Sequence, residues 1–164
     1  FYLQNKNQIN KINAQNKYMN AEDSDIYGCE AEIKKNIGLG TFLYAGYSYA
    51  ASKTNGSDKL AGAAQNMLKL SALTDFGGGF SGGLSMYFVD SKKRIEGDNR
   101  VDTPSYLSGD LTLNYDFYKN KMGVQLLAKN IGNASILYPS EKNTYVGDYP
   151  TMPSTVYLKL YKRF

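Results

Sequence analysis

The amino-acid sequence predicts an all-β protein, an antiparallel β-barrel that crosses a membrane. Apolar and polar residues alternate along about eight segments, and these segments cover slightly more than half of the 164 residues. An ordinary globular domain has only about 20–25% of its residues in strands. The connections between the segments also alternate between long and short. Alternation within the strands and between their connections together favours the all-β fold.

In chain order, the predicted strands are 1–11, 26–35, 41–51, 66–76, 80–90, 106–117, 122–131 and 153–164. The first has the weakest alternation. The second places Tyr27 and Cys29 on an apolar face and Glu30 and Glu32 on a polar face, which is the two-residue period of a strand. The third strand is the richest in aromatic residues.

The fourth predicted strand sets Leu68 and Leu70 against Lys69. The sixth has the most regular pattern, with leucines such as Leu111 on one face and polar residues such as Asp110 on the other. The fifth, seventh and eighth carry the same alternation with varying clarity. We therefore expect every strand to have one apolar and one polar face.

The predicted connections fall into two classes of length. The long ones are 12–25, 52–65, 91–105 and 132–152, and the short ones are 36–40, 77–79 and 118–121. Membrane β-barrels have tight periplasmic turns and longer extracellular loops. Predicted strand lengths of 10–12 residues also suit the roughly 9–11 residues that a tilted strand needs to cross a bilayer. Many of the 15 tyrosines lie near strand ends, as in the aromatic girdles of such barrels.

Composition excludes several classes of function. The sequence has one cysteine and no histidine, which removes a disulfide framework, a Cys/His zinc site and imidazole-based catalysis. We expect no catalytic residue, no metal site and no cofactor, and therefore no enzyme. The net charge of +4 is too small and too dispersed to indicate a nucleic-acid partner.

Four segments carry a resemblance to a known family. They are the closing segment Thr151–Phe164, the segment Gly123–Asn133 followed by Tyr138 and Pro139, the pair Asn7–Ile9 and Asp25–Glu32, and Leu43–Tyr49. Taken in their order along the chain, these segments resemble parts of the barrel of TonB-dependent outer-membrane receptors. Lys162 departs from the family pattern, which usually has an aromatic residue at the third position from the end.

The resemblance implies that residues 1–164 are the C-terminal segment of a bacterial outer-membrane barrel of about 22 strands, whose plug domain is absent from this chain. It also implies TonB-energised uptake of a scarce nutrient such as a ferric siderophore or haem, with TonB acting through the missing plug part. Phe164 resembles the terminal signal that the barrel-assembly machinery reads.

Two loops supply candidate ligand-binding residues. Their basic and aromatic members are Lys92, Lys93, Arg94, Arg100, Tyr145 and Tyr149. Basic side chains raise the local concentration of an anionic metal chelate, and tyrosines stack on its rings. The same residues would also suit contact with lipopolysaccharide phosphates or simple solvation.

Two alternatives remain open. A complete eight-stranded barrel would act as a surface adhesin or structural protein and would require 153–164 to pair with 1–11. A water-soluble β-sandwich binding module is the third possibility, and the need for detergent distinguishes it from both barrels.

Overall fold

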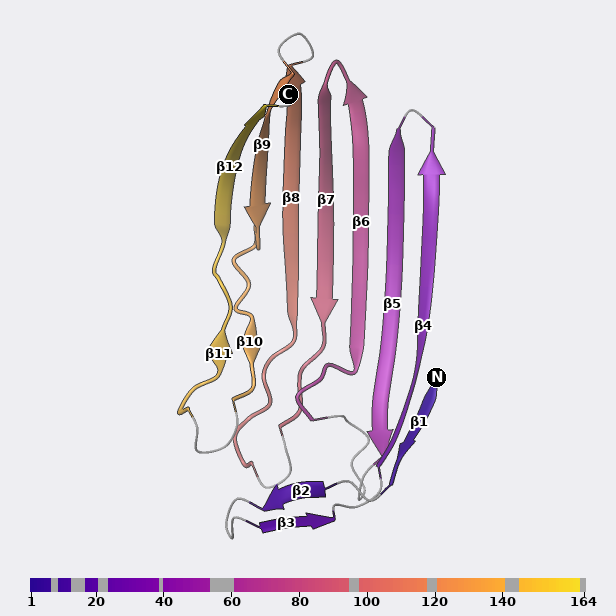
Figure 1. Cartoon of the computed structure of the whole chain (residues 1–164), viewed down its shortest axis with the longest axis vertical. Helices are drawn as coiled ribbons and strands as arrows, with labels where there is room; N and C mark the ends of the chain where they lie inside the picture. The colour runs from indigo at the N-terminus through magenta and orange to yellow at the C-terminus, as the bar shows by residue number, and fades with distance from the viewer. Residues whose placement is uncertain are drawn as a thin grey trace.

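In a computed structural model, the described residues are 1–6, 9–12, 17–20, 24–38, 40–53, 61–94, 98–117, 121–140 and 145–162. They form one eight-stranded antiparallel sheet with the order β1-β4-β5-β6-β7-β8-β9-β12 (Figure 1). Its strands are β1 (Tyr2–Asn5), β4 (Ser24–Ile37), β5 (Thr41–Lys53), β6 (Asn66–Gly77), β7 (Phe80–Val89), β8 (Tyr106–Phe117), β9 (Met122–Lys129) and β12 (Thr155–Lys162). Among the described residues, no helix is long and apolar enough to cross a membrane. The predicted all-β antiparallel fold is confirmed.

Two small ladders accompany the main sheet. β2 (Ile9–Ile12) pairs with β3 (Lys17–Asn20), and β10 (Leu137–Tyr138) pairs with β11 (Tyr149–Pro150). Both lie at the end of the sheet where β5, β7 and β9 end, whereas β4, β6 and β8 end at the opposite end, a few residues before the next strand begins (Figure 1). The predicted alternation of long and short connections is therefore present in space.

The sheet has one apolar and one polar face. The register sets Ile33, Ala45, Leu70 and Met86 in one row on the apolar face. Glu32, Gly46, Lys69 and Tyr87 form a neighbouring row on the polar face. Side chains directly opposite each other on paired strands share a face, so the predicted alternation is continuous across the sheet.

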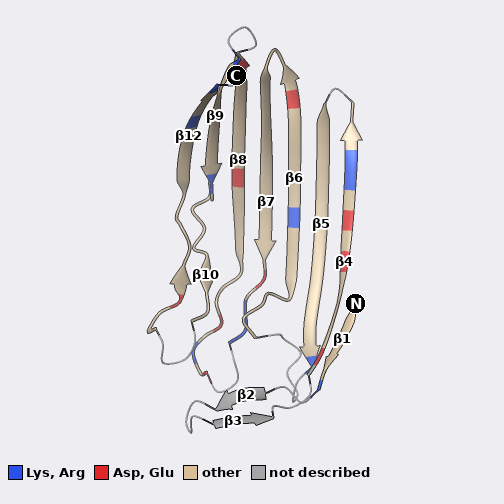
Figure 2. Ribbon diagram, in the orientation of Figure 1, with Lys and Arg blue, Asp and Glu red and all other residues tan. Residues whose placement is uncertain are grey.

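Charged residues on the apolar face occur only near strand ends in the described strands. Asp25 and Lys53 are register partners at the long-connection end. Lys35 lies two residues before the end of β4, and Lys162 is the last residue of β12. The charges that Figure 2 shows in the middle of β4, β6 and β8 include Glu32, Lys69 and Asp110, which lie on the polar face. An uncharged band between two charged rims is typical of a lipid-facing barrel surface.

The apolar face has no second layer packed against it in the described part of the chain. The buried apolar residues found there are Ala51 and Ala64, whereas Ile33, Leu158 and Leu160 each expose more than two thirds of their surface. Exposed apolar patches of this extent mark a surface that another apolar phase covers. The arrangement supports a wall in lipid and disfavours a water-soluble sandwich.

Most strand boundaries differ from the predicted ones by one or two residues, and two differences have a clear physical reason. The predicted strand 1–11 is divided, because only Tyr2–Asn5 joins the sheet and Ile9–Ile12 pairs with β3 instead. The weak alternation of this segment gives no continuous apolar face to hold it in the sheet. β9 ends at Lys129 because Asn130 adopts a left-handed φ of 49° and its side chain accepts a hydrogen bond from the amide of Ala134.

The main sheet is open. β1 and β12 lie at its two opposite edges, as Figure 1 shows, and no pairing joins them among the described residues. The alternative of a complete eight-stranded barrel requires that pairing. The sheet instead has the form of part of a larger wall.

Aromatic side chains cover two glycines on the polar face. A methyl group at Gly123 would overlap the ring of Tyr161, its direct partner on β12, and one at Gly46 would overlap Tyr44. The covering hydroxyl of Tyr161 donates a hydrogen bond of 2.6 Å to Asp116. Glycine therefore creates the space that each ring fills, and the ring ties neighbouring strands together.

Candidate functional site

The long connections before and after β8 and β9 meet at one end of the sheet. Lys92 forms isolated bridges to Ala64 and Thr103, while β10 and β11 pair within the last long connection. These bonds order the described parts of residues 90–105 and 130–154. We call the set Lys92, Arg94, Asp98, Arg100, Tyr138, Ser140, Tyr145, Asp148 and Tyr149 the loop cluster.

Arg94 is one of two buried cations in the loop cluster, together with Lys92. Its Nε donates to the carbonyl of Val101 at 2.7 Å, and its Nη2 forms an ion pair of 2.7 Å with Asp148. The two side chains expose only 7% and 14% of their surface. Hydrogen bonds to ionised groups are strong when they are shielded from water. Arg94 therefore fastens the two loops to each other.

Arg100 makes a second connection between the same loops. Its guanidinium pairs with Asp98 at 2.6 Å, and it donates to the hydroxyl and carbonyl oxygens of Ser140 at 2.9 and 2.8 Å. It also donates to the carbonyl of Tyr145 at 3.4 Å. The planar donor fork of arginine allows these simultaneous bonds. The position of Tyr145 is thereby tied to Arg100.

Lys92 lies between aromatic rings. Its Nζ is 3.9 Å from the ring centroid of Tyr138 and 5.4 Å from that of Tyr106, and it donates to the carbonyl of Leu137 at 3.3 Å. Cations within about 6 Å of a ring centroid are attracted to the ring face. Burial lowers the pKa of the Lys92 ammonium below its ordinary value.

The two carboxylates of the loop cluster are stabilised in their ionised form. Hydrogen bonds from Arg100 lower the pKa of Asp98 to about 2. The hydrogen bond from Arg94 is the main cause that lowers the pKa of Asp148. Both ion pairs are therefore fully formed at neutral pH.

The exposed part of the loop cluster is aromatic. The rings of Tyr145 and Tyr149 stack with centroids 5.6 Å apart and planes 11° apart. They expose 52% and 48% of their surface, and Val146 between them exposes 98%. A stacked pair of half-exposed rings offers a flat surface on which a planar or ring-shaped ligand can pack.

The structure brings most of the predicted ligand-binding residues together. Lys92, Arg94, Arg100, Tyr145 and Tyr149 belong to one cluster, although the sequence places them in two loops. Lys93 lies beside them and its carbonyl accepts a hydrogen bond from Gly62. Phe164 lies outside the described residues.

Sequence reasoning missed the partners of these cations. Asp98, Asp148, Ser140 and Tyr138 engage the basic side chains that were expected to attract an anion. The available signal was the presence of acidic residues in the same two loops. The sequence does not indicate which acid pairs with which base.

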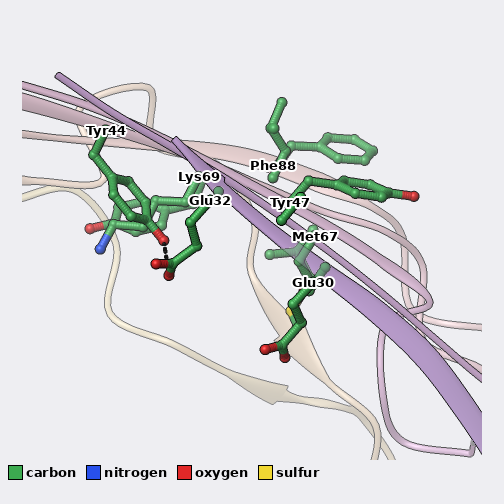
Figure 3. A pocket seen from close by; sticks show the side chains of 13 residues that line it. Glu30, Glu32, Tyr44, Tyr47, Met67, Lys69 and Phe88 are labelled. Atoms are coloured by element: carbon green, nitrogen blue, oxygen red, sulfur yellow. Dashed lines mark hydrogen bonds between the residues drawn. The ribbon is translucent and has the colours of Figure 1, made fainter. Parts of the chain in front are cut away.

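The polar face holds a second candidate, a hollow of about 310 Å³ around Gly46. Tyr44 donates a hydrogen bond of 2.9 Å to Glu32, which also pairs with Lys34 at 2.7 Å. Lys69 lies 5.4 Å from the ring centroids of both Tyr44 and Tyr87. Figure 3 shows Glu32 beneath Tyr44, with Glu30 further along the strand. This hollow was not singled out from the sequence, although the alternation of Glu30, Glu32 and Lys34 placed charges on that face.

These features define a class: the wall of a membrane β-barrel, with an apolar outer face, a charged inner face and ordered loops at one end. The family model for the TonB dependent receptor-like beta-barrel matches residues 1–133. The chain belongs to this family of transporters, and the resemblance stated from its motifs is confirmed. Membership implies the outer membrane and an interaction with TonB. A search of curated proteins finds no match.

Proposed function

We propose that the chain is the C-terminal segment of an outer-membrane receptor that imports a scarce nutrient, a ferric siderophore or haem, with energy delivered through TonB. The single observation that supports a ligand contact is the exposed Tyr145–Tyr149 stack held on the loop cluster. A rigid aromatic surface loses little conformational entropy when a ring-bearing ligand packs on it. The segment itself carries out no chemical reaction in this proposal.

The basic residues divide into two roles in this proposal. Arg94 and Lys92 are buried and hold the loops in place, Arg94 through its ion pair with Asp148, the residue before Tyr149. Arg100, whose side chain exposes 31% of its surface, places a guanidinium at the carbonyl of Tyr145, and Lys93 adds a cation to the loop that carries Arg94. Contact with lipopolysaccharide phosphates is the competing use of that charge.

Ligand binding by the full-length receptor tests the proposal. We expect a ferric siderophore or haem to bind, and Tyr145→Ala to weaken binding by roughly threefold to tenfold, because one ring contact contributes about 0.5–1.5 kcal/mol. Tyr145→Phe is the matched control, since it keeps the ring and should keep the affinity. Equal affinity for wild type and Tyr145→Ala would remove this residue from the ligand site.

The assembly and size of the protein test the remaining parts. Deletion of Phe164 should reduce the amount of heat-modifiable folded barrel if this residue is the assembly signal. In this proposal the native polypeptide has several times the 18.2 kDa mass of this segment, because the proposed receptor includes a plug and further strands. A native mass near 18 kDa would instead favour the small barrel that acts as an adhesin or structural protein.

A further inference from the structure

The apolar face contains a groove of about 410 Å³ near the short-turn end of the sheet. It crosses β4 to β7 and is lined chiefly by two adjacent rows of side chains. These rows are Ile33, Ala45, Leu70 and Met86, and Lys35, Leu43, Ala72 and Leu84. The volume lies within the range of about 300–1,000 Å³ that is usual for small-molecule sites.

Two small side chains produce the groove. Ala45 and Ala72 lie in neighbouring rows on adjacent strands, and each faces a leucine, Leu70 and Leu43 respectively. Their methyl groups leave a depression between side chains that rise higher. An apolar depression of this kind on a lipid-covered surface accepts a hydrocarbon chain. The chain gives the atoms that line the depression the van der Waals contacts that an empty gap would deny them.

Lys35 supplies the charge at one end of the groove. It shares the apolar face with Ile33 and Leu43, while Glu32 and Lys34 pair with each other on the opposite face. In the described part of the chain, no carboxylate lies within ion-pair distance of Lys35. Two residues separate it from the end of β4, so its ammonium is at the rim of the apolar band.

From this geometry we propose that the groove is a binding site for one glycerophospholipid, whose acyl chain lies over Ala45 and Ala72 and whose phosphate pairs with Lys35. The proposal rests on the proposed function in one respect, the placement of the apolar face in a bilayer. Short turns face the periplasm in bacterial barrels. The lipid therefore comes from the inner leaflet of the outer membrane and has a phosphate headgroup.

Native mass spectrometry of the full-length receptor in mild detergent tests the site by counting retained phospholipid. We expect one retained phospholipid on the wild type. Lys35→Gln should lower retention roughly fivefold, because one lysine near a charged lipid surface has about that effect. Lys53→Gln is the matched control, since Lys53 lies on the same face at the opposite end of the sheet.

A second pair of variants tests the groove itself. Ala72→Leu fills the depression and should lower retention even though Lys35 is unchanged. Ala128→Leu makes the same substitution on the apolar face of β9, outside the groove, and should retain lipid as the wild type does. When the wild-type protein has been stripped of lipid, adding phosphatidylglycerol should restore the bound lipid. Adding monoolein, which lacks a phosphate, should not.

The outcomes separate this inference from the proposed function. A folded, ligand-binding receptor that retains equal lipid with and without Lys35 overturns the site alone. Retention of lipopolysaccharide in place of phospholipid also overturns it, because that lipid belongs to the other leaflet. A wild-type protein that is soluble without detergent overturns the membrane placement on which both proposals rest.

Discussion

The strand wall and the loop cluster are held together in different ways. In the wall, each strand from β4 to β8 pairs with the next strand along most of its length, and one two-residue repeat decides which side chains share a face. In the loop cluster, single side chains join residues 54 positions apart, as in Arg94 and Asp148, or 40 apart, as in Arg100 and Ser140. A pattern specifies the wall, whereas individual pairs specify the cluster.

The two regions should therefore respond differently to charge. The outer face of the wall meets lipid, where a charge has no partner and costs free energy. The loop cluster already contains paired charges, and losing one partner leaves the other buried. Adding a charge should damage the wall, and removing a charge should damage the cluster.

The largest effect is expected from a cation in the middle of the wall. Leu111 lies on the apolar face of β8 between Leu84 and Ala128. Leu111→Arg should destabilise the barrel by up to about 4 kcal/mol, the cost of arginine near the bilayer midplane. The amount of folded, heat-modifiable barrel in outer membranes measures the effect.

Thr112→Arg is the matched control for that prediction. Thr112 is the next residue of the same strand and lies on the polar face opposite Gly83 and Leu127. Assembly should remain close to the wild-type level. Equal loss in both variants would contradict the assignment of the two faces.

A second prediction breaks the loop cluster and leaves the wall intact. Arg94→Ala removes one partner of an enclosed ion pair and should cost about 3 kcal/mol of local stability, because Asp148 loses its charge partner. Chymotrypsin cleavage after Tyr145 should then accelerate roughly a hundredfold, while assembly is unchanged.

Asp148→Ala and the double variant complete a thermodynamic cycle for this ion pair. The double variant should be less damaged than the sum of the single variants, because neither charge is left alone. Additive effects would show that Arg94 and Asp148 are not coupled. Reduced assembly of the barrel would show that the wall depends on the cluster.

The periodic pattern predicted the wall well, because the alternation of apolar and polar residues within each strand is enough to assign its two faces. The predicted segment 106–117 coincides with β8, and 41–51 falls two residues short of β5. Periodicity did not predict the end of a strand where the backbone conformation of a single residue determines that end. Asn130 ends β9 through a left-handed φ of 49°, which no alternation reveals.

The candidate site was predicted only in part. Charge and aromatic type pointed to Arg94, Arg100, Tyr145 and Tyr149, and the structure places them together. Their partners were not predicted, because side chains 40 or more positions apart meet only after the wall brings its loops side by side. Sequence thus indicated which residues matter in the loops but not that their charges are already paired.

A smaller effect should follow from closing one glycine space on the polar face. Gly123→Ala forces the ring of Tyr161 aside and breaks its 2.6 Å hydrogen bond to Asp116. The loss should be about 1.5 kcal/mol, as for a hydrogen bond to a charged group. Urea unfolding of the barrel in lipid vesicles measures it. Gly38→Ala, with no atom within 4 Å of the added methyl group, should leave the midpoint unchanged.

The smallest effect at neutral pH is expected from titration of the loop cluster. Asp98 has a pKa of about 2, lowered by Arg100, and the pKa of Asp148 is lowered by Arg94. A carboxylate in the unfolded chain has a pKa of about 3.9, so the stabilisation is complete above that pH and is lost as pH falls towards 2. Hydrogen exchange measured as the pH falls from 5 to about 2.5, and corrected for intrinsic rates, should therefore show faster opening at 98–102 and 145–150.

The amides of β8 serve as the internal control, because backbone pairing in the wall does not depend on these carboxylates. Equal acceleration in β8 would mean that acid loosens the wall and the cluster together, and the division between a patterned wall and a pairwise cluster would then fail.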